Sequence, residues 1–248
     1  MQHAPDAALG QRLTQVQARI RAAAQVAERD PETVTLLAVS KTKPVEDVLA
    51  LARLGQRHFG ENYVQEALEK QRLVALQPEA PPLVWHFIGP IQTNKTRDLA
   101  AHFQWVHTVD RLKIARRLQE QRPASLPPLN VCLQVNVSKE ASKSGLAFEE
   151  VTALAQEIVA FDRLRLRGLM AIPAPETDPN RQRQPFAALR ECLDELRQRL
   201  PMQPLDTLSM GMSGDMEAAI AEGATLVRIG SALFGPRALS HKKHRPLE

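Results

Sequence analysis

The sequence predicts an α/β fold, a single (β/α)8 TIM barrel preceded by one extra helix. Eight short, apolar, β-rich runs alternate with eight helical patterns. From the first run at Val34 to the last at Ala224, the repeat averages about 27 residues, the size of one βα unit. The length of 248 residues also matches the ~250 residues typical of such barrels. A doubly wound open sheet is the alternative.

The extra helix is expected over about 7–29, where Leu9, Leu13, Val16 and Ile20 recur at helical spacing. The eight strands follow from the apolar runs and are expected at 34–39, 57–60, 83–88, 104–108, 130–136, 164–169, 206–209 and 224–228. The helices between and after them are expected at 44–55, 63–76, 94–102, 111–121, 148–160, 181–200, 214–222 and directly after Gly230.

The chain is expected to form one domain over 1–248. The proline-rich stretches 77–82, 123–128 and 173–185 are short enough to be surface loops, and no residues remain for a second domain. The basic end of the chain, about 238–248, is expected to be a flexible, solvated tail.

Composition excludes several classes of protein. No apolar run approaches the ~18 residues of a membrane span, and the first residues lack a signal-peptide pattern. Cys132 and Cys192 are far apart, which argues against a disulfide framework and favours a reducing, cytoplasmic setting. The net charge of +4 with 4% aromatics does not indicate nucleic-acid binding, and the seven histidines show no metal-ligand spacing.

The first strand ends in Lys41, and the active sites of such barrels lie at the carboxyl ends of the strands. Apolar neighbours around the stem of this lysine would lower the pKa of its amine and make it a nucleophile toward aldehydes. The alternative is a surface lysine whose charged head reaches water. Lys43, two residues further on, is expected to be solvated.

Polar residues follow other strands too. Asn62 either binds a ligand or caps the next helix, and His86 is either a ligand residue or a core histidine. Ser213 follows the seventh strand, and Gly230 and Ser231 follow the eighth. The loops after these two strands are the usual phosphate site of a barrel, formed by backbone N–H groups at helix starts. Two capped helix starts with incidental glycines are the alternative.

Several longer motifs carry a resemblance to a known protein family. They are LAVSKTKP at 37–44, FGENYVQE at 59–66, WHFIGPIQTNK at 85–95, GLM at 168–170, LSMGMSGD at 208–215 and VRIG at 227–230, with FG at 234–235. Together they span nearly the whole chain. By these motifs the sequence resembles the pyridoxal phosphate homeostasis proteins, which are related to the N-terminal domain of alanine racemase.

This resemblance implies a barrel that binds pyridoxal 5′-phosphate (PLP) covalently. By motif match, Lys41 forms the Schiff base and Arg228 faces the pyridine nitrogen. The remaining cofactor-binding residues implied by the motifs are Ser213, Gly230 and Ser231 at the phosphate and Asn62 and His86 at the ring and its phenolic oxygen. The resemblance implies no catalytic residue and no metal.

The resemblance further implies a role in vitamin B6 homeostasis and amino-acid balance, by buffering PLP or delivering it to apo PLP-dependent enzymes. An arginine cannot take the proton that a carboxylate partner would share with the pyridine nitrogen, so Arg228 disfavours carbanion chemistry. A PLP-dependent amino-acid racemase or lyase is the alternative, and a barrel enzyme for another phosphorylated metabolite is a third. Without a partner-completing second domain, a monomer is expected.

Overall fold

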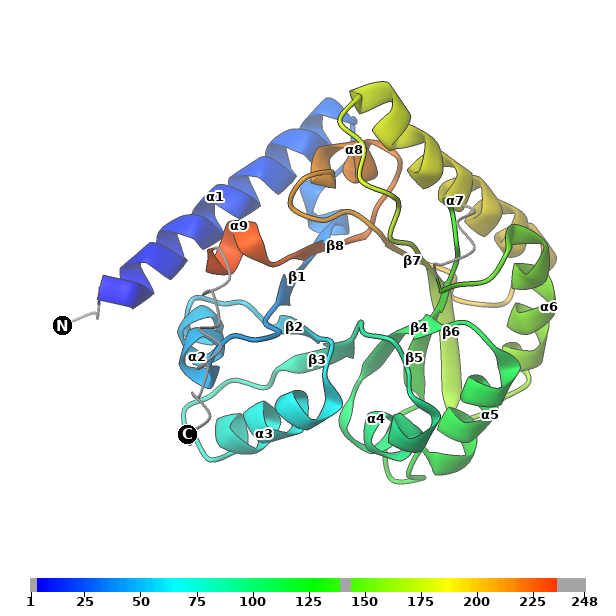
Figure 1. The fold of residues 1–248 in the computed structure, drawn as a ribbon, viewed down its shortest axis with the longest axis horizontal. Helices are drawn as coiled ribbons and strands as arrows, with labels where there is room; N and C mark the ends of the chain where they lie inside the picture. The colour runs from blue at the N-terminus through cyan, green and yellow to red at the C-terminus, as the bar shows by residue number, and fades with distance from the viewer. Residues whose placement is uncertain (1–3, 139–143, 236–248) are drawn as a thin grey trace, which may run out of the picture.

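The computed structural model describes residues 4–138 and 144–235 and contains a closed barrel of eight parallel strands (Figure 1). The strands are β1 (Thr35–Val39), β2 (His58–Glu61), β3 (Val84–Phe87), β4 (Trp105–Val109), β5 (Leu129–Gln134), β6 (Leu164–Met170), β7 (Thr207–Ser209) and β8 (Leu226–Ile229). They follow one another around the barrel in chain order, and β8 pairs with β1 to close it. The predicted (β/α)8 barrel is confirmed, and the open sheet is not formed.

The helices of the described residues surround this barrel. They are α1 (Ala4–Val26), α2 (Val45–Arg53), α3 (Val64–Ala75), α4 (Thr96–His102), α5 (Leu112–Gln121), α6 (Phe148–Val159), α7 (Pro179–Arg199), α8 (Met216–Ala221) and α9 (Ser231–Phe234), with 3-10 turns at Pro31–Thr33 and Thr93–Lys95. The strand and helix positions agree with the sequence prediction to within a few residues. The tail predicted at 238–248 lies outside the described residues.

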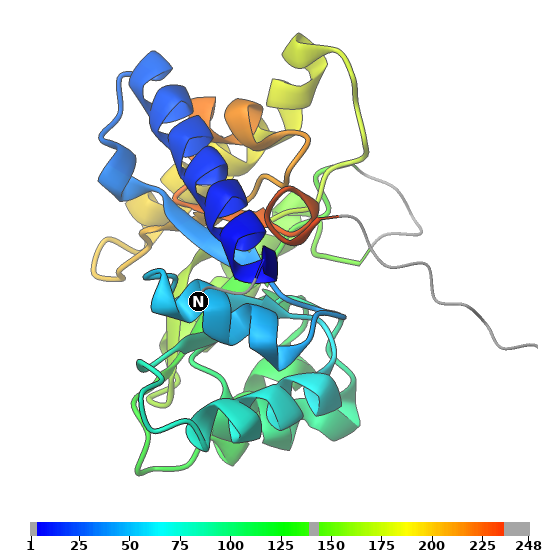
Figure 2. The same cartoon turned by 90° about the vertical axis from the view of Figure 1, so that its left-hand side faces the viewer.

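The extra helix α1 packs on the outside of the barrel against α2, α8 and α9 (Figures 1 and 2). Its apolar stripe, Leu9, Leu13, Val16 and Ile20, is buried as the helical spacing predicted. Burying one such side chain stabilises the fold by about 1.5–3 kcal/mol. The helix therefore covers the outside of the barrel near β1 and β8, the first and last strands.

One close approach between strands needs a glycine. Gly168 in β6 has φ 154°, and a Cβ added there would lie 1.9 Å from the carbonyl oxygen of Thr207 in β7. No side chain fits at that distance, so glycine lets β6 and β7 pair this closely.

No helix within the described residues is both long enough and apolar enough to cross a bilayer.

Candidate functional site

A cavity of about 360 Å³ opens at the carboxyl ends of the strands. Six of the seven residues singled out in the sequence line it: Lys41, Asn62, Ser213, Arg228, Gly230 and Ser231. They come from the ends of β1, β2, β7 and β8 or the loops that follow, which are far apart in the sequence. The remaining lining includes the apolar Val39, Ile88 and Ile172 and also Lys43, which is half-buried at the cavity instead of solvated as expected. A small, mostly apolar cavity with a few polar groups at this end of a barrel is the usual form of a ligand site.

The backbone on both sides of Lys41 is held by buried polar groups. The Ser40 hydroxyl donates to Glu61 Oε1 at 2.6 Å, and the Ser40 carbonyl accepts from Lys70 Nζ at 2.7 Å. On the other side, the Thr42 N–H donates to Glu66 Oε1 at 2.6 Å. Thr42 has φ 62°, a conformation that costs a β-branched residue energy, so this bond helps to fix the turn. Hydrogen bonds on both sides therefore fix the backbone position of Lys41.

Lys70 of α3 is the centre of this brace. It is buried, and its Nζ also donates to Glu61 Oε1 at 2.8 Å and Glu66 Oε1 at 2.6 Å. Burial raises the pKa of Glu61, while the charge and hydrogen bond of Lys70 oppose that rise. Lys70 is not among the residues predicted from the sequence. The available signal was its place on the same helical face as Ala67 and Val74, which are also buried.

Arg228 of β8 lies at the floor of the cavity and is buried. Its Nη1 donates to the carbonyl oxygen of Ser209 at 2.6 Å and to Ser209 Oγ at 3.0 Å, and its Nη2 donates to the Ala171 carbonyl at 2.8 Å. These bonds use three of its five N–H donors, which leaves two without an acceptor among the described residues. Burial lowers the pKa of Arg228 to about 10, so it stays protonated at neutral pH.

Three small residues form another side of the cavity. Ser231 Oγ lies 3.4 Å from Ser213 Oγ, and the Ala232 N–H points at the same oxygen, also at 3.4 Å. Gly230 caps the start of α9. These two hydroxyls and one backbone N–H meet between the β7 and β8 loops, where the sequence places an expected anion site.

Side chains of helix α1 form hydrogen bonds with the segments that follow β7 and β8. Arg19 Nη2 donates to the Ser213 carbonyl at 3.2 Å and pairs with Glu217 of α8. Arg12 Nε donates to the Leu233 carbonyl in α9 at 2.8 Å. The extra N-terminal helix therefore fixes the two loops that carry the small polar residues, a role that the sequence analysis did not assign to it.

Asn62 carries an unpaired polar atom at the cavity. Its Oδ1 is buried and has no hydrogen-bond partner among the described residues. A buried polar atom without a partner costs about 1–3 kcal/mol, which a bound ligand can recover. The loop of Asn62 packs tightly on Gly89, where an added Cβ would lie 2.3 Å from the Asn62 carbonyl oxygen.

The structure does not bring His86 to this cavity. Its ring is fully buried inside the barrel and is hydrogen-bonded to His58 and His107. Side chains alternate along a strand, so His86 and Ile88 point to the same side, and it is Ile88 that lines the cavity. His86 belongs to the next layer below. The sequence indicates that the His86 side chain points into the barrel, but it does not indicate which layer of interior side chains His86 joins.

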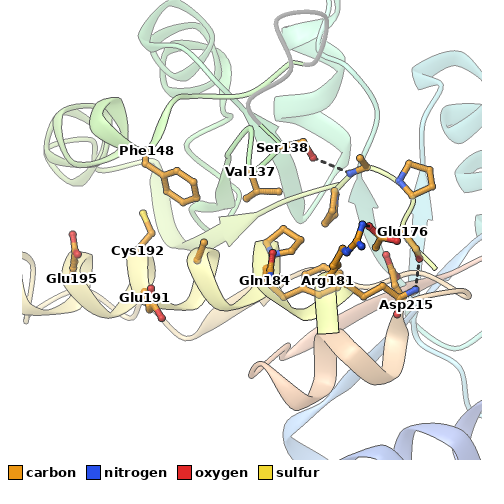
Figure 3. Close-up of a pocket in the computed structure, with 17 residues that line it drawn as sticks. Val137, Ser138, Phe148, Glu176, Arg181, Gln184, Glu191, Cys192, Glu195 and Asp215 are labelled. Carbon is orange, nitrogen blue, oxygen red and sulfur yellow. Dashed lines mark hydrogen bonds and ion pairs between the residues drawn. The ribbon is translucent and has the colours of Figure 1, made fainter. Parts of the chain in front are cut away.

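A second, larger hollow of about 710 Å³ lies beside the β6–α7 loop (Figure 3). Phe148, Pro185 and Cys192 are among its apolar lining, and Glu176, Arg181 and Glu191 among its charged lining. Ser138 Oγ accepts a hydrogen bond from the Ala174 N–H at 2.9 Å across one end. None of the seven cofactor-binding residues expected from the sequence lines this hollow. The described residues also contain no group of three His, Cys, Asp or Glu that could hold a metal ion.

Barrels of many kinds carry a cavity at this end, and the family match places this one in the class of alanine racemase-type barrels. Residues 12–238 match the family described as "Alanine racemase, N-terminal domain". An alanine racemase of Clostridium difficile 630 shares the fold, with a TM-score of 0.71 at 15% identity over 93% of this chain and 57% of that one.

Curated relatives are far more similar. A protein of Pseudomonas aeruginosa named "Pyridoxal phosphate homeostasis protein" is 62% identical over 92% of this chain and 96% of its own length. One of the same name from Escherichia coli K12 is 54% identical over 93% and 97%. The solved structure of PipY from Synechococcus elongatus PCC7942 with PLP bound has a TM-score of 0.80 at 35% identity, covering 92% and 100%. The chain belongs to the family of pyridoxal phosphate homeostasis proteins.

Proposed function

We propose that this protein binds PLP in the cavity at the carboxyl ends of its strands and acts in intracellular PLP homeostasis and amino-acid balance. The observation that carries the proposal is the convergence of Lys41, Arg228 and the small residues of the β7 and β8 loops on one cavity. The names of the curated relatives, and the PLP bound in the PipY structure, support it.

The residues of the cavity fit each part of PLP. Lys41 supplies an amine for the aldehyde and shares the cavity wall with Val39 and Ile88. Arg228 has two N–H donors left for the pyridine nitrogen. Asn62 contributes a buried polar side chain at the cavity. The two hydroxyls and the Ala232 N–H around Ser213 suit a phosphate.

We further propose that the protein holds PLP without turning over a substrate. Bound PLP supplies an electron sink for carbanions, and the sink works best when the pyridine nitrogen is protonated. Arg228 stays protonated at neutral pH and can only donate a hydrogen bond there, so it keeps that nitrogen unprotonated. The single tyrosine of the chain, Tyr63, is exposed and does not line the cavity. A racemase or lyase remains the alternative that sustained turnover would favour.

The same proposal covers partners and setting. A cavity open to solvent on one barrel is suited to buffering PLP or transferring it to apo PLP-dependent enzymes, and we propose that the chain does so as a monomer. Both cysteines are free thiols, which suits a cytoplasmic setting.

The first test is the visible spectrum of the purified protein with PLP, before and after borohydride reduction, followed by peptide mass mapping. A yellow band that reduction fixes onto the Lys41 peptide supports the proposal. Lys41→Ala should abolish the reducible adduct and leave weaker, phosphate-anchored binding, whereas the matched control Lys95→Ala should keep the adduct. A protein that stays colourless with added PLP, or an adduct on another lysine such as Lys43, contradicts the assignment of Lys41.

A second test asks whether the protein delivers PLP to apo-enzymes. Transfer of bound PLP to an apo-enzyme should be faster than release into buffer, and equal rates would exclude active delivery. Amino-acid turnover that disappears in Lys41→Ala would instead establish the enzyme alternative. Arg228→Glu should restore a protonated ring nitrogen and shift the absorption band of bound PLP, and an unchanged band would mean that Arg228 does not face the ring.

A further inference from the structure

A continuous row of hydrogen bonds crosses the barrel interior and ends at Arg228. His58 Nδ1 lies 2.9 Å from His86 Nε2, and His86 Nδ1 lies 2.8 Å from His107 Nε2. His107 Nδ1 lies 2.8 Å from Ser209 Oγ, the oxygen that also accepts from Arg228 Nη1 at 3.0 Å. The row joins β2, β3, β4, β7 and β8 and uses no residue of the cofactor cavity except Arg228.

The interior of this row is closed to water. His86, His107 and Ser209 have no exposed surface. Only His58 is half-buried, and it lines a separate hollow of about 300 Å³ on the side of the barrel away from the cofactor cavity, where the strands begin. The ring of His86 stacks on Trp105 with an interplanar angle of 13°, which holds it in one plane. The row thus connects the two ends of the barrel through dry protein.

The three rings are neutral at physiological pH. Burial lowers the pKa of His107 to about 3, lowers the pKa of His86 well below its usual value, and lowers that of His58. A neutral imidazole carries one N–H donor and one acceptor nitrogen. Because both nitrogens of His86 and of His107 are in the row, the donors of the row must all point the same way along it.

The Ser209 end selects that direction. Arg228 already donates to Ser209 Oγ, so the Ser209 hydroxyl hydrogen needs an acceptor, and His107 Nδ1 is the one within reach. The hydroxyl then donates to His107, His107 Nε2–H donates to His86, and His86 Nε2–H donates to His58 Nδ1. His58 keeps its own hydrogen on Nε2, so every polar atom of the row is paired.

We propose that these histidines form a directional relay that couples protonation of His58 at one end of the barrel to the hydrogen bonds that position Arg228 at the other. A protonated His58 has no acceptor nitrogen, so His86 Nε2 must accept from it and each bond of the row reverses. The row takes up one proton. Each hydrogen crosses the bond that it bridges: the His86 Nε2 hydrogen passes to His58 Nδ1, the His107 Nε2 hydrogen to His86 Nδ1, and the Ser209 hydroxyl hydrogen to His107 Nδ1. Ser209 is reprotonated by Arg228, which regains a proton from the solvent-open cavity that it lines. The new Ser209 hydroxyl hydrogen has no acceptor on His107 and turns toward Arg228.

Burial lowers the pKa of His58, and charged groups of both signs on several elements surround it. Around the two hollows that it lines there are three arginines and two carboxylates, namely Arg21 of α1, Arg57, Arg167 of β6, Glu32 and Asp206, in addition to His86. Arg167 and Asp206 are ion-paired with each other at 2.6 Å. The relay should therefore reverse only on the acid side of neutrality.

The test is long-range ¹H–¹⁵N NMR of the full chain labelled with ¹⁵N-histidine, without added PLP, from pH 8 to pH 5. At pH 8 both interior histidines, His86 and His107, should show the Nε2–H tautomer. As His58 titrates, both should change to the Nδ1–H tautomer with the same midpoint. Opposite tautomers at pH 8, or unchanged tautomers while His58 titrates, would overturn the relay.

Two variants sharpen this test. In His58→Asn the amide oxygen keeps an acceptor near the position of Nδ1 but cannot be protonated, so His86 and His107 should stay in the Nε2–H form down to pH 5. The matched control His102→Asn removes an exposed histidine at the end of α4 and should leave the change intact. A tautomer change that persists in His58→Asn would also overturn the proposal. Because these spectra need no PLP, the relay and the proposed function can fail independently.

Discussion

Replacing Lys70 by methionine tests whether the buried brace behind Lys41 stabilises the fold and the site. Lys70 Nζ donates to the Ser40 carbonyl, Glu61 and Glu66, all within 2.8 Å, and both Lys70 and Glu61 are buried. Methionine fills similar space without donors. It leaves the Glu61 carboxyl without its cation, and Glu61 Oε2 already lacks a partner among the described residues.

The expected loss is about 3–5 kcal/mol of unfolding free energy at pH 7, the usual cost of removing one partner from a buried ion pair. That is a large part of the 5–15 kcal/mol typical of a domain. The exposed pair of Arg72 with Glu69 on the same helix gives the control, since Arg72→Met should leave the unfolding midpoint unchanged.

The loss should also depend on pH. Burial raises the pKa of Glu61, and removing Lys70 takes away what opposes that rise. An acid whose pKa is higher in the folded state stabilises the fold below its unfolded pKa and loses that contribution as pH rises. The deficit of Lys70→Met should therefore shrink as the pH is lowered from 7 toward 5.

Denaturant unfolding of both variants at pH 5, 6 and 7 measures this, and borohydride trapping of PLP measures the presentation of Lys41. A deficit below about 1 kcal/mol at pH 7, or one that grows toward pH 5, would refute the reasoning that Lys70 compensates a buried Glu61 charge.

Three further predictions follow from packing and burial. Gly89→Ala should displace the loop of Asn62, cost about 1–3 kcal/mol and weaken PLP retention on gel filtration, and unchanged retention would contradict the tight contact. Since the folded protein holds His107 neutral with a pKa of about 3, unfolding takes up a proton below pH 6.5, and stability should fall by up to ~1.4 kcal/mol per pH unit toward pH 3. Denaturant series at pH 6.5, 5.5 and 4.5 should show a shallower fall in His107→Gln, because the buried carboxyls with raised pKa act equally in both proteins. Burial raises the pKa of Cys132 to about 12 and of Cys192 to about 11, so iodoacetamide at pH 7.5 should modify Cys132 only after unfolding and the half-buried Cys192 only slowly. Fast native labelling of Cys132 would count against its burial.

Much of the fold was predictable from the sequence because each element satisfies its own local pattern. The apolar run before Lys41 and the proline and glycine at 44 and 55 locate β1 and α2 by themselves. The barrel then follows from the number of repeats and the length of the chain. The end of the barrel that carries the cavity was also predictable, since every strand of a parallel barrel ends at the same face.

The depth at which an inward-facing side chain lies inside the barrel was not predictable from the sequence. His86 and Ile88 occupy equivalent inward positions of one strand, and only the stagger of neighbouring strands decides which one reaches the cavity. The partners of Lys70 and the row from His58 to Arg228 are likewise contacts between residues distant in the chain.

The sequence by itself determined the order of strands and helices, the face of the barrel that carries the site, and the residue types available there, because these depend on local periodicity and on where strands end. Only the tertiary structure decided which buried polar groups pair. Pairing inside a dry barrel depends on the register of strands brought together by closure, and a shift of one residue in that register would place a different side chain in each hydrogen bond.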